Sequence, residues 1–125
     1  MEFVVEFEAG NKVLRVSMDG IVTEQTLIDL TAEVRRLFES QTPDVLLIDL
    51  SGVTGFEISS EVVRFIARAP SPIPDEIVRV IVAPQGHIFG VTRMFQCYAD
   101  GHRPNVHVVK SLEEAYAYLG WAVAS

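Results

Sequence analysis

Cysteine is almost absent from this sequence, which has Cys97 and no other among its 125 residues. One thiol forms no internal disulfide and cannot supply a metal cage by itself, so a disulfide scaffold and a thiolate zinc module are excluded. The first residues also lack the basic start, long apolar run and small-residue cleavage site of a secretory signal. Together these absences predict a protein of the reducing cytoplasm.

Basic residues are scarce as well, with 10 Lys and Arg against 17 Asp and Glu, for a net charge of −7. Phosphate binding needs a clustered excess of Lys and Arg, so nucleic acid and an anionic membrane surface are poor candidates for the main partner. No stretch reaches the roughly 18 consecutive apolar residues of a membrane span. We therefore expect no nucleic-acid partner and no integral membrane segment.

Apolar residues are plentiful in comparison. They make up 49% of the chain, whereas charged residues make up 22%, which is the balance of an ordinary globular core. A chain of this length can bury about two thirds of its unfolded surface. We expect one domain that spans residues 1–125.

The beginning of the chain alternates apolar and polar residues in two stretches, residues 3–8 and 13–18, on either side of a glycine-asparagine turn. This pattern predicts a β-hairpin with one apolar face, closed by Asp19-Gly20. Thr23 can then cap a helix over about residues 24–40, in which apolar side chains recur at helical spacing.

The rest of the chain predicts alternating strands and helices. Continuous apolar runs are typical of strands covered on both faces, and apolar spacing near 3.6 residues is typical of amphipathic helices. The strands expected are residues 45–50, 77–82 and 106–108, the helices expected are residues 60–69, 88–99 and 112–119, and residues 51–57 are expected to form a loop. The order predicts an α/β fold: one mixed sheet of about five strands, mostly parallel after an N-terminal antiparallel hairpin, with four helices.

The carboxyl ends of the parallel strands are the expected site of function, because open parallel sheets bind ligands and partners at that edge. All four helices are expected to start there. The residues expected at this edge are Asp19, Thr23, residues 49–60, residues 84–87, and Lys110 with Ser111.

The segment at this edge resembles a known family. Asp49-Leu50-Ser51-Gly52-Val53-Thr54, followed by Phe56 and Ser59-Ser60, is similar to the strand-loop-helix signature of STAS domains, the fold of bacterial anti-sigma-factor antagonists. The chain more closely resembles the SpoIIAA-like group of that family, through residues 80–84, 89–95 and 112–115 together with Leu119. The resemblance covers nearly the whole chain and implies a STAS-like (SpoIIAA-like) fold. It also implies a regulatory or protein-interaction domain that is not an enzyme.

The resemblance implies a binding surface for a protein partner, made of the loop and the start of the second helix. Its residues would be Ser51, Thr54, Glu57, Ser59, Ser60 and Glu61. In phosphorylated STAS antagonists the serine that matches Ser60 receives phosphate from a partner kinase, within a motif of an acid, two serines and a glycine. Here Ile58 and Glu61 replace the acid and the glycine, so we expect Ser60 to stay unphosphorylated and one of the two serines to cap the helix.

The third helix is apolar around more than half of its circumference, which is more than a surface helix needs. Core packing explains this most simply, with Cys97 as a small buried apolar residue. The alternative is a movable lid over a hydrophobic ligand, made of Phe89, Met94, Phe95 and Tyr98, which the fold's similarity to lipid carriers of the CRAL-TRIO type supports. The protein would then be a carrier or sensor of a small hydrophobic ligand or lipid at the membrane surface.

Catalytic and metal-binding side chains are present singly but form no recognisable constellation. Ser59 or Ser60 with His87 and Asp49 could be imagined as a hydrolytic triad, but neither serine has a Gly-x-Ser-x-Gly elbow. The glycines of the predicted loop lack the lysine and the spacing of a phosphate loop. We expect no enzymatic activity, no metal and no cofactor.

The predicted topology also bears on assembly. Sequential right-handed crossovers place helices largely on one face of a sheet. The other face of residues 45–50 and 78–82 is apolar and would need a cover that the short C-terminal tail cannot supply. We therefore predict a homodimer that uses this sheet face or the apolar surface of the third helix.

Overall fold

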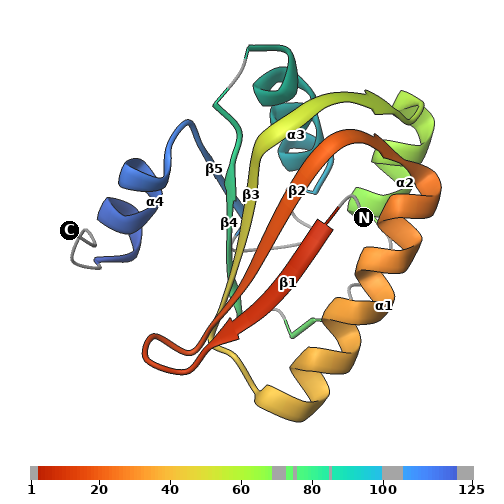
Figure 1. The fold of residues 1–125 in the computed structure, drawn as a ribbon. Coiled ribbons are helices and arrows are strands. Elements are labelled where there is room, and N and C mark those ends of the chain that lie inside the picture. The colour runs from red at the N-terminus through yellow and green to blue at the C-terminus, as the bar shows by residue number, and fades with distance from the viewer. Residues whose placement is uncertain (1–2, 69–72, 75, 85, 100–105, 121–125) are drawn as a thin grey trace.

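In the part of the chain that the structure describes, five strands form one sheet with helices on both faces (Figure 1). The computed structural model describes residues 3–68, 73–74, 76–84, 86–99 and 106–120. The elements in chain order are β1 (Phe3–Glu8), β2 (Val13–Thr23), α1 (Glu24–Gln41), β3 (Val45–Glu57), α2 (Ser60–Arg68), β4 (Val78–Val82), α3 (Gly86–Ala99), β5 (Val106–Val109) and α4 (Leu112–Leu119). The strands are in sequential order, with β1 antiparallel to β2 and the other neighbours parallel. The predicted mixed sheet is confirmed.

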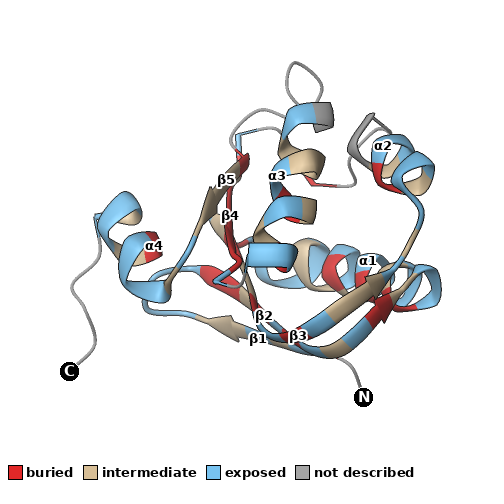
Figure 2. Ribbon diagram, turned by 90° about the horizontal axis from the view of Figure 1, so that it is seen from above, coloured by how far each residue is buried: buried red, intermediate tan, exposed pale blue. Residues whose placement is uncertain are grey.

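Different helices cover the two faces of the sheet. Leu14 and Leu46 belong to the larger core, on the face covered by α1, α2 and α3. The residues beside them in the sequence, Val13 and Leu47, point to the opposite face, because side chains alternate along a strand. There they pack against α4, in which Ala115 is fully buried. Figure 2 shows that β4, between the two layers, is buried along almost its whole length.

The position of α4 overturns the expectation that the helices lie on one face. A right-handed crossover fixes the side of a helix that joins two parallel strands, and α1, α2 and α3 each do so. No strand follows α4 in the described residues, so its own apolar side chains decide its face, and they pack near Val80 and Val82. The apolar sheet face expected to form a homodimer is therefore already covered. The homodimer stays a prediction, with the apolar surface of α3 as its remaining route.

The β1 side of the face that carries α4 is mostly polar, although Val4 is an exposed apolar side chain there. Glu6 pairs with Arg15, and Ser17 next to them is exposed. The Arg15 Nε donates a hydrogen bond of 2.9 Å to Glu8 Oε2, and its guanidinium carbon lies 5.6 Å from the ring centroid of Tyr116 on α4. The polar residues of this part of the sheet can face water.

Two strands are longer than the sequence predicts. Asp19-Gly20 does not close the hairpin, because β2 continues to Thr23, and residues 51–57 form the second half of β3 rather than a loop. Residues 19–23 pair in parallel with residues 52–57. The register shifts twice in this stretch, and each shift leaves one extra residue in β3. Such bulges interrupt the alternation of apolar and polar residues, so the sequence pattern resembles that of a loop.

Hydroxyl caps fix the starts of α1 and α4, and the cap of α1 is the one that the sequence predicts. Thr23 and Thr26 cap each other: the Oγ1 of each accepts a hydrogen bond from the amide of the other, both at 3.2 Å. At α4 the Ser111 hydroxyl accepts a 3.0 Å bond from the amide of Glu114. A cap of this kind stabilises a helix by about 1 kcal/mol. The two caps hold both helix starts at the carboxyl edge of the sheet.

Arg79 of β4 is a charged residue in the core, only 4% exposed. Its guanidinium donates hydrogen bonds to the backbone carbonyls of Ile77, Ile73 and Pro74, at 2.9, 3.0 and 3.2 Å. Hydrogen bonds from a charged donor are stronger than neutral ones. Arg79 thereby holds the segment before β4 in place and keeps Ile73 in the larger core.

His107 of β5 fastens α4 to the sheet. Its Nε2 is hydrogen-bonded to the Tyr118 hydroxyl, and the centroids of the two rings are 4.2 Å apart. Burial lowers the pKa of His107 from its ordinary value of 6.5, because partial removal from water disfavours the charged ring. The folded protein therefore takes up this proton less readily than the unfolded chain.

The lowered pKa of His107 predicts a loss of stability in mild acid. Below about pH 6.5 the unfolded chain binds a proton at residue 107 before the folded protein does, so the free energy of unfolding should fall as pH drops from about 7 to about 5.5. We expect His107→Asn to reduce this slope. His87→Asn, at an exposed position of α3, is the matched control and should retain it. Urea denaturation at several pH values measures the slopes, and equal slopes in the two variants would contradict the assignment.

Candidate functional site

The strands β2 and β3 run on together beyond the rest of the sheet. In the described residues, β1 pairs with β2 as far as Met18, and β4 pairs with β3 as far as Asp49. Residues 19–23 and 51–57 therefore form a two-stranded ribbon at the carboxyl edge, visible in Figure 1 where β2 and β3 curve past their neighbours toward α2. This ribbon includes half of the interaction residues that the sequence predicts.

The ribbon is buried on its inner side and exposed on its outer side. Val22 and Val53 are both 0% exposed and anchor it to the larger core. Ser51, Thr54 and Glu57 are exposed. A backbone held by buried anchors loses little conformational freedom when a partner binds, so more of the contact energy remains as affinity.

Ser59 caps α2, directly after the ribbon. Its Oγ accepts a 3.2 Å hydrogen bond from the amide of Val62, an interaction that contributes about 1 kcal/mol to helix stability. Ser60 and Glu61 follow in the first turn, and both are exposed. All six predicted interaction residues are thus exposed along one continuous segment at the carboxyl edge: Ser51, Thr54, Glu57, Ser59, Ser60 and Glu61.

The surface around this segment is acidic. Glu57 and Glu61 lie on it, and Asp19 is exposed on the other strand of the ribbon. Thr23, the residue that pairs with Glu57, is followed by the exposed Glu24 at the start of α1. These carboxylates disfavour an anionic ligand and are complementary to a basic surface.

Asp49 has a structural role at the base of the ribbon. Its Oδ1 accepts hydrogen bonds from the Ser51 amide at 2.9 Å and from the Ser51 hydroxyl at 2.5 Å. It pairs with Val82, whose side chain packs on the α4 side of the sheet. Ser59 and Ser60 at the start of α2, and His87 of α3, belong to helices on the opposite face. The sheet therefore separates Asp49 from the other members of the triad considered from the sequence.

Two further observations concern metal binding and membranes. Among the described residues, no group of three or more His, Cys, Asp or Glu side chains could hold a metal ion. Within the same residues, no helix has the length and apolar character needed to cross a membrane.

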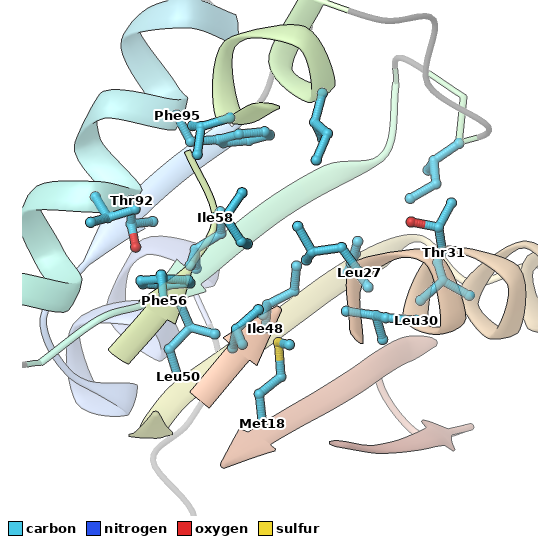
Figure 3. A pocket seen from close by; sticks show the side chains of 18 residues that line it. Met18, Leu27, Leu30, Thr31, Ile48, Leu50, Phe56, Ile58, Thr92 and Phe95 are labelled. Carbon is cyan, nitrogen blue, oxygen red and sulfur yellow. The ribbon is translucent and has the colours of Figure 1, made fainter. Parts of the chain in front are cut away.

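An apolar cavity of about 230 Å³ lies between α1, α2, α3 and the sheet (Figure 3). α1 packs on β1 and β2, whereas α2 packs on α3, and α3 packs on β3 and β5. The cavity fills the space between these two groups of elements. The described residues of its wall are apolar apart from Thr31 and Thr92. The Thr92 hydroxyl already donates a 2.8 Å hydrogen bond to the carbonyl of Ile88, so it offers a ligand little.

The four residues predicted to hold a hydrophobic ligand have different surroundings. Phe95 lines the cavity. Phe89 packs against the larger core, with the Lys110 Nζ 4.9 Å from its ring centroid, and Met94 is half-buried. The side chain of Tyr98 lies outside the described residues. Their role in ligand binding stays a prediction.

Sequence reasoning missed most of the cavity wall and misplaced one side chain. Cys97 is exposed rather than buried, because it lies one turn after the exposed Arg93 on the outer side of α3. The apolar spacing of α1 and the apolar run of β3 give no sign that several of their residues line a cavity. Ile58 is the one signal that could have indicated the cavity, since it is apolar where the related motif has an acid, and its side chain lines the wall.

Three solved structures show which known fold this chain has. The anti-sigma factor antagonist SpoIIAA in its unphosphorylated form matches with a TM-score of 0.62 and 12% identity, over 94% of this chain and 97% of that chain. An anti-sigma factor antagonist from Mycobacterium paratuberculosis matches with a TM-score of 0.63 and 20% identity, over 94% and 92%. The phosphorylated form of SpoIIAA from Bacillus matches with a TM-score of 0.59 and 14% identity, over 94% and 98%.

Comparison by sequence finds less. No protein-family model matches the chain, and no curated protein matches it. The structural likeness nevertheless covers nearly the whole chain, so the SpoIIAA-like (STAS) fold that the resemblance implied is confirmed.

Gly52 lies where the two strands of the ribbon approach closely. A Cβ at this position would be 2.7 Å from Oδ1 of Asp19 and 3.1 Å from the backbone oxygen of Met18. The carboxylate can rotate away, but the backbone oxygen cannot move without disturbing β2. At Gly55, in the same strand, an added Cβ would meet no atom within 4 Å.

We expect Gly52→Ala to lower the free energy of unfolding by about 1 to 2 kcal/mol, because the added methyl group overpacks the ribbon. Gly55→Ala is the matched control and should leave stability unchanged or raise it by less than about 1 kcal/mol. Urea denaturation of both variants measures the difference. If Gly52→Ala proved as stable as Gly55→Ala, the close approach of the two strands would be wrong.

Proposed function

We propose that this domain is a non-enzymatic regulatory module that binds a partner protein through the ribbon and the first turn of α2. The observation that carries the proposal is the exposure of all six predicted interaction residues along one edge of the sheet. The fold supports it, because the similar structures include proteins named as antagonists of an anti-sigma factor, which is itself a protein.

Charge indicates the kind of surface that would bind here. Asp19, Glu57 and Glu61 are exposed on or beside the ribbon, and the whole chain has a net charge of −7. A partner surface with Lys and Arg residues would complement this edge and speed association. Because exposed charges are screened by salt, the interaction should weaken as ionic strength rises.

We also place this interaction in the cytoplasm. Cys97 is the chain's one thiol and is exposed, and a reducing compartment keeps such a thiol from forming bonds between molecules. Binding through the ribbon requires complementary surfaces and no cofactor.

Affinity capture from a native lysate tests the interaction surface. We would compare the wild-type protein with Glu57→Lys and Glu113→Lys, which reverse one exposed charge each, on the ribbon and on α4. We expect a partner that the wild type and Glu113→Lys retain equally and that Glu57→Lys recovers at least about tenfold less well, because a like charge now faces the basic partner.

Urea denaturation of both charge-reversal variants is the control, since each must fold for the comparison to count. A partner recovered equally by Glu57→Lys and Glu113→Lys would contradict the ribbon as the interaction surface. Recovery of no specific partner by the wild type would contradict the proposed function as a whole.

A separate prediction concerns Ser60. Glu57 and Glu61 are exposed close to it and would repel a phosphate group. Ile58 is half-buried and lines the cavity, so an acid at that position would lose its water. We expect Ser60 to be unphosphorylated in cells, and phosphoproteomics measures its occupancy. Stoichiometric phosphate on Ser60 would show that the chain retains the phosphate switch.

A further inference from the structure

The apolar cavity is not explained by protein binding at the ribbon. A well-packed core has few voids larger than a water molecule, yet this cavity measures about 230 Å³ and lies within the larger core, among Met18, Leu30 and Ile48 (Figure 3). We propose that it is a binding site for the aliphatic chain of a fatty acid.

The chemistry of the wall selects a hydrocarbon. Among the residues that the structure describes, those lining the cavity include no charged side chain, and their two polar members are threonines. Thr92 has its hydroxyl bonded within α3. A nucleotide, a sugar or an amino acid would leave its polar groups unpaired in this cavity, at a large cost in free energy. An aliphatic chain has no such groups to satisfy.

The volume of the cavity limits the size of the ligand. A cavity of about 150 Å³ with a similar aliphatic and aromatic lining holds benzene, whereas drug-sized ligands occupy about 300 to 1,000 Å³. The cavity of about 230 Å³ falls between these sizes. An aliphatic chain of moderate length therefore fits it, whereas a large fused ring system such as a sterol does not.

The carboxylate of the fatty acid would lie where the cavity opens to water. Thr31 lines the cavity and is also exposed on the surface of α1, so the wall meets water at this residue. The carboxylate of the fatty acid would stay in water there, because no cation among the described lining residues could pair with it. The two most exposed large apolar side chains of the described residues lie on two of the helices around the cavity. They are Ile28 on α1, 61% exposed, one turn before Thr31, and Phe65 on α2, 73% exposed.

Methyl NMR with dodecanoate as the probe, below its critical micelle concentration, tests the proposal. We expect saturable shifts at Leu30, Ile48 and Ile66, which line the cavity. Val80 and Val82 pack on the α4 face of the sheet and should not shift. The absence of saturable shifts, or shifts of equal size at both sets of methyl groups, would overturn the proposal.

A matched pair of variants on α1 locates the entry. Thr31 and Ala32 are adjacent and exposed, but of the two Thr31 alone lines the cavity. An indole in place of Thr31 would fill the opening, so we expect Thr31→Trp to weaken dodecanoate binding by about tenfold or more and Ala32→Trp to bind within about twofold of the wild type. Equal affinities of the two variants, measured by calorimetry, would overturn this entry route.

The outcome does not depend on the proposed function. Wild-type methyl shifts decide whether the cavity binds an aliphatic chain even if one variant is unstable. Glu57→Lys changes the ribbon surface and none of the residues that line the cavity. Failure of dodecanoate binding and failure of partner capture are therefore separate results.

Discussion

Parallel pairing of β2 with β3 is the contact on which the rest of the structure depends. The register runs from Val13 with Val45 to Thr23 with Glu57, so both strands end at the same edge. α1 begins directly after Thr23, and α2 begins a few residues after Glu57. The inner side chains of the two strands form one wall of the cavity, and their outer side chains form the exposed ribbon. One long pairing thus creates both candidate sites.

The helix α2 belongs to both sites. Its first turn carries Ser60 and Glu61 at the surface, whereas Val63 and Ile66, farther along the helix, line the cavity. α2 packs on α3, and α3 contributes Phe95 to the same wall. A protein on the ribbon and an aliphatic chain in the cavity would therefore contact the same helix, from outside and from inside.

Local chemistry made part of this structure predictable from the sequence. Alternation predicted β1, and the hydroxyl of Thr23 predicted the start of α1, because both depend on neighbouring residues. The strand at residues 51–57 was not predictable, since bulges break its alternation and its partner strand lies far earlier in the chain. The face chosen by α4 was not predictable because no crossover constrains it. The exposed interaction residues were predictable because open parallel sheets bind partners at the carboxyl ends of their strands, and because the family resemblance names the same segment. The cavity was not predictable, because it depends on the space between several helices and strands. The apolar pattern of the third helix therefore indicated Phe95 but not the other residues of the cavity wall.

The proposed interaction surface requires residues 51–57 to form an ordered strand, and amide hydrogen exchange of the free protein tests this most directly. We expect slow exchange, comparable with that of the first half of β3, for the amides of this stretch that pair with β2, around Val53 and Phe56. Exchange across residues 51–57 at the rate of an unstructured chain would contradict the ribbon, together with the interaction surface and the cavity wall that depend on it.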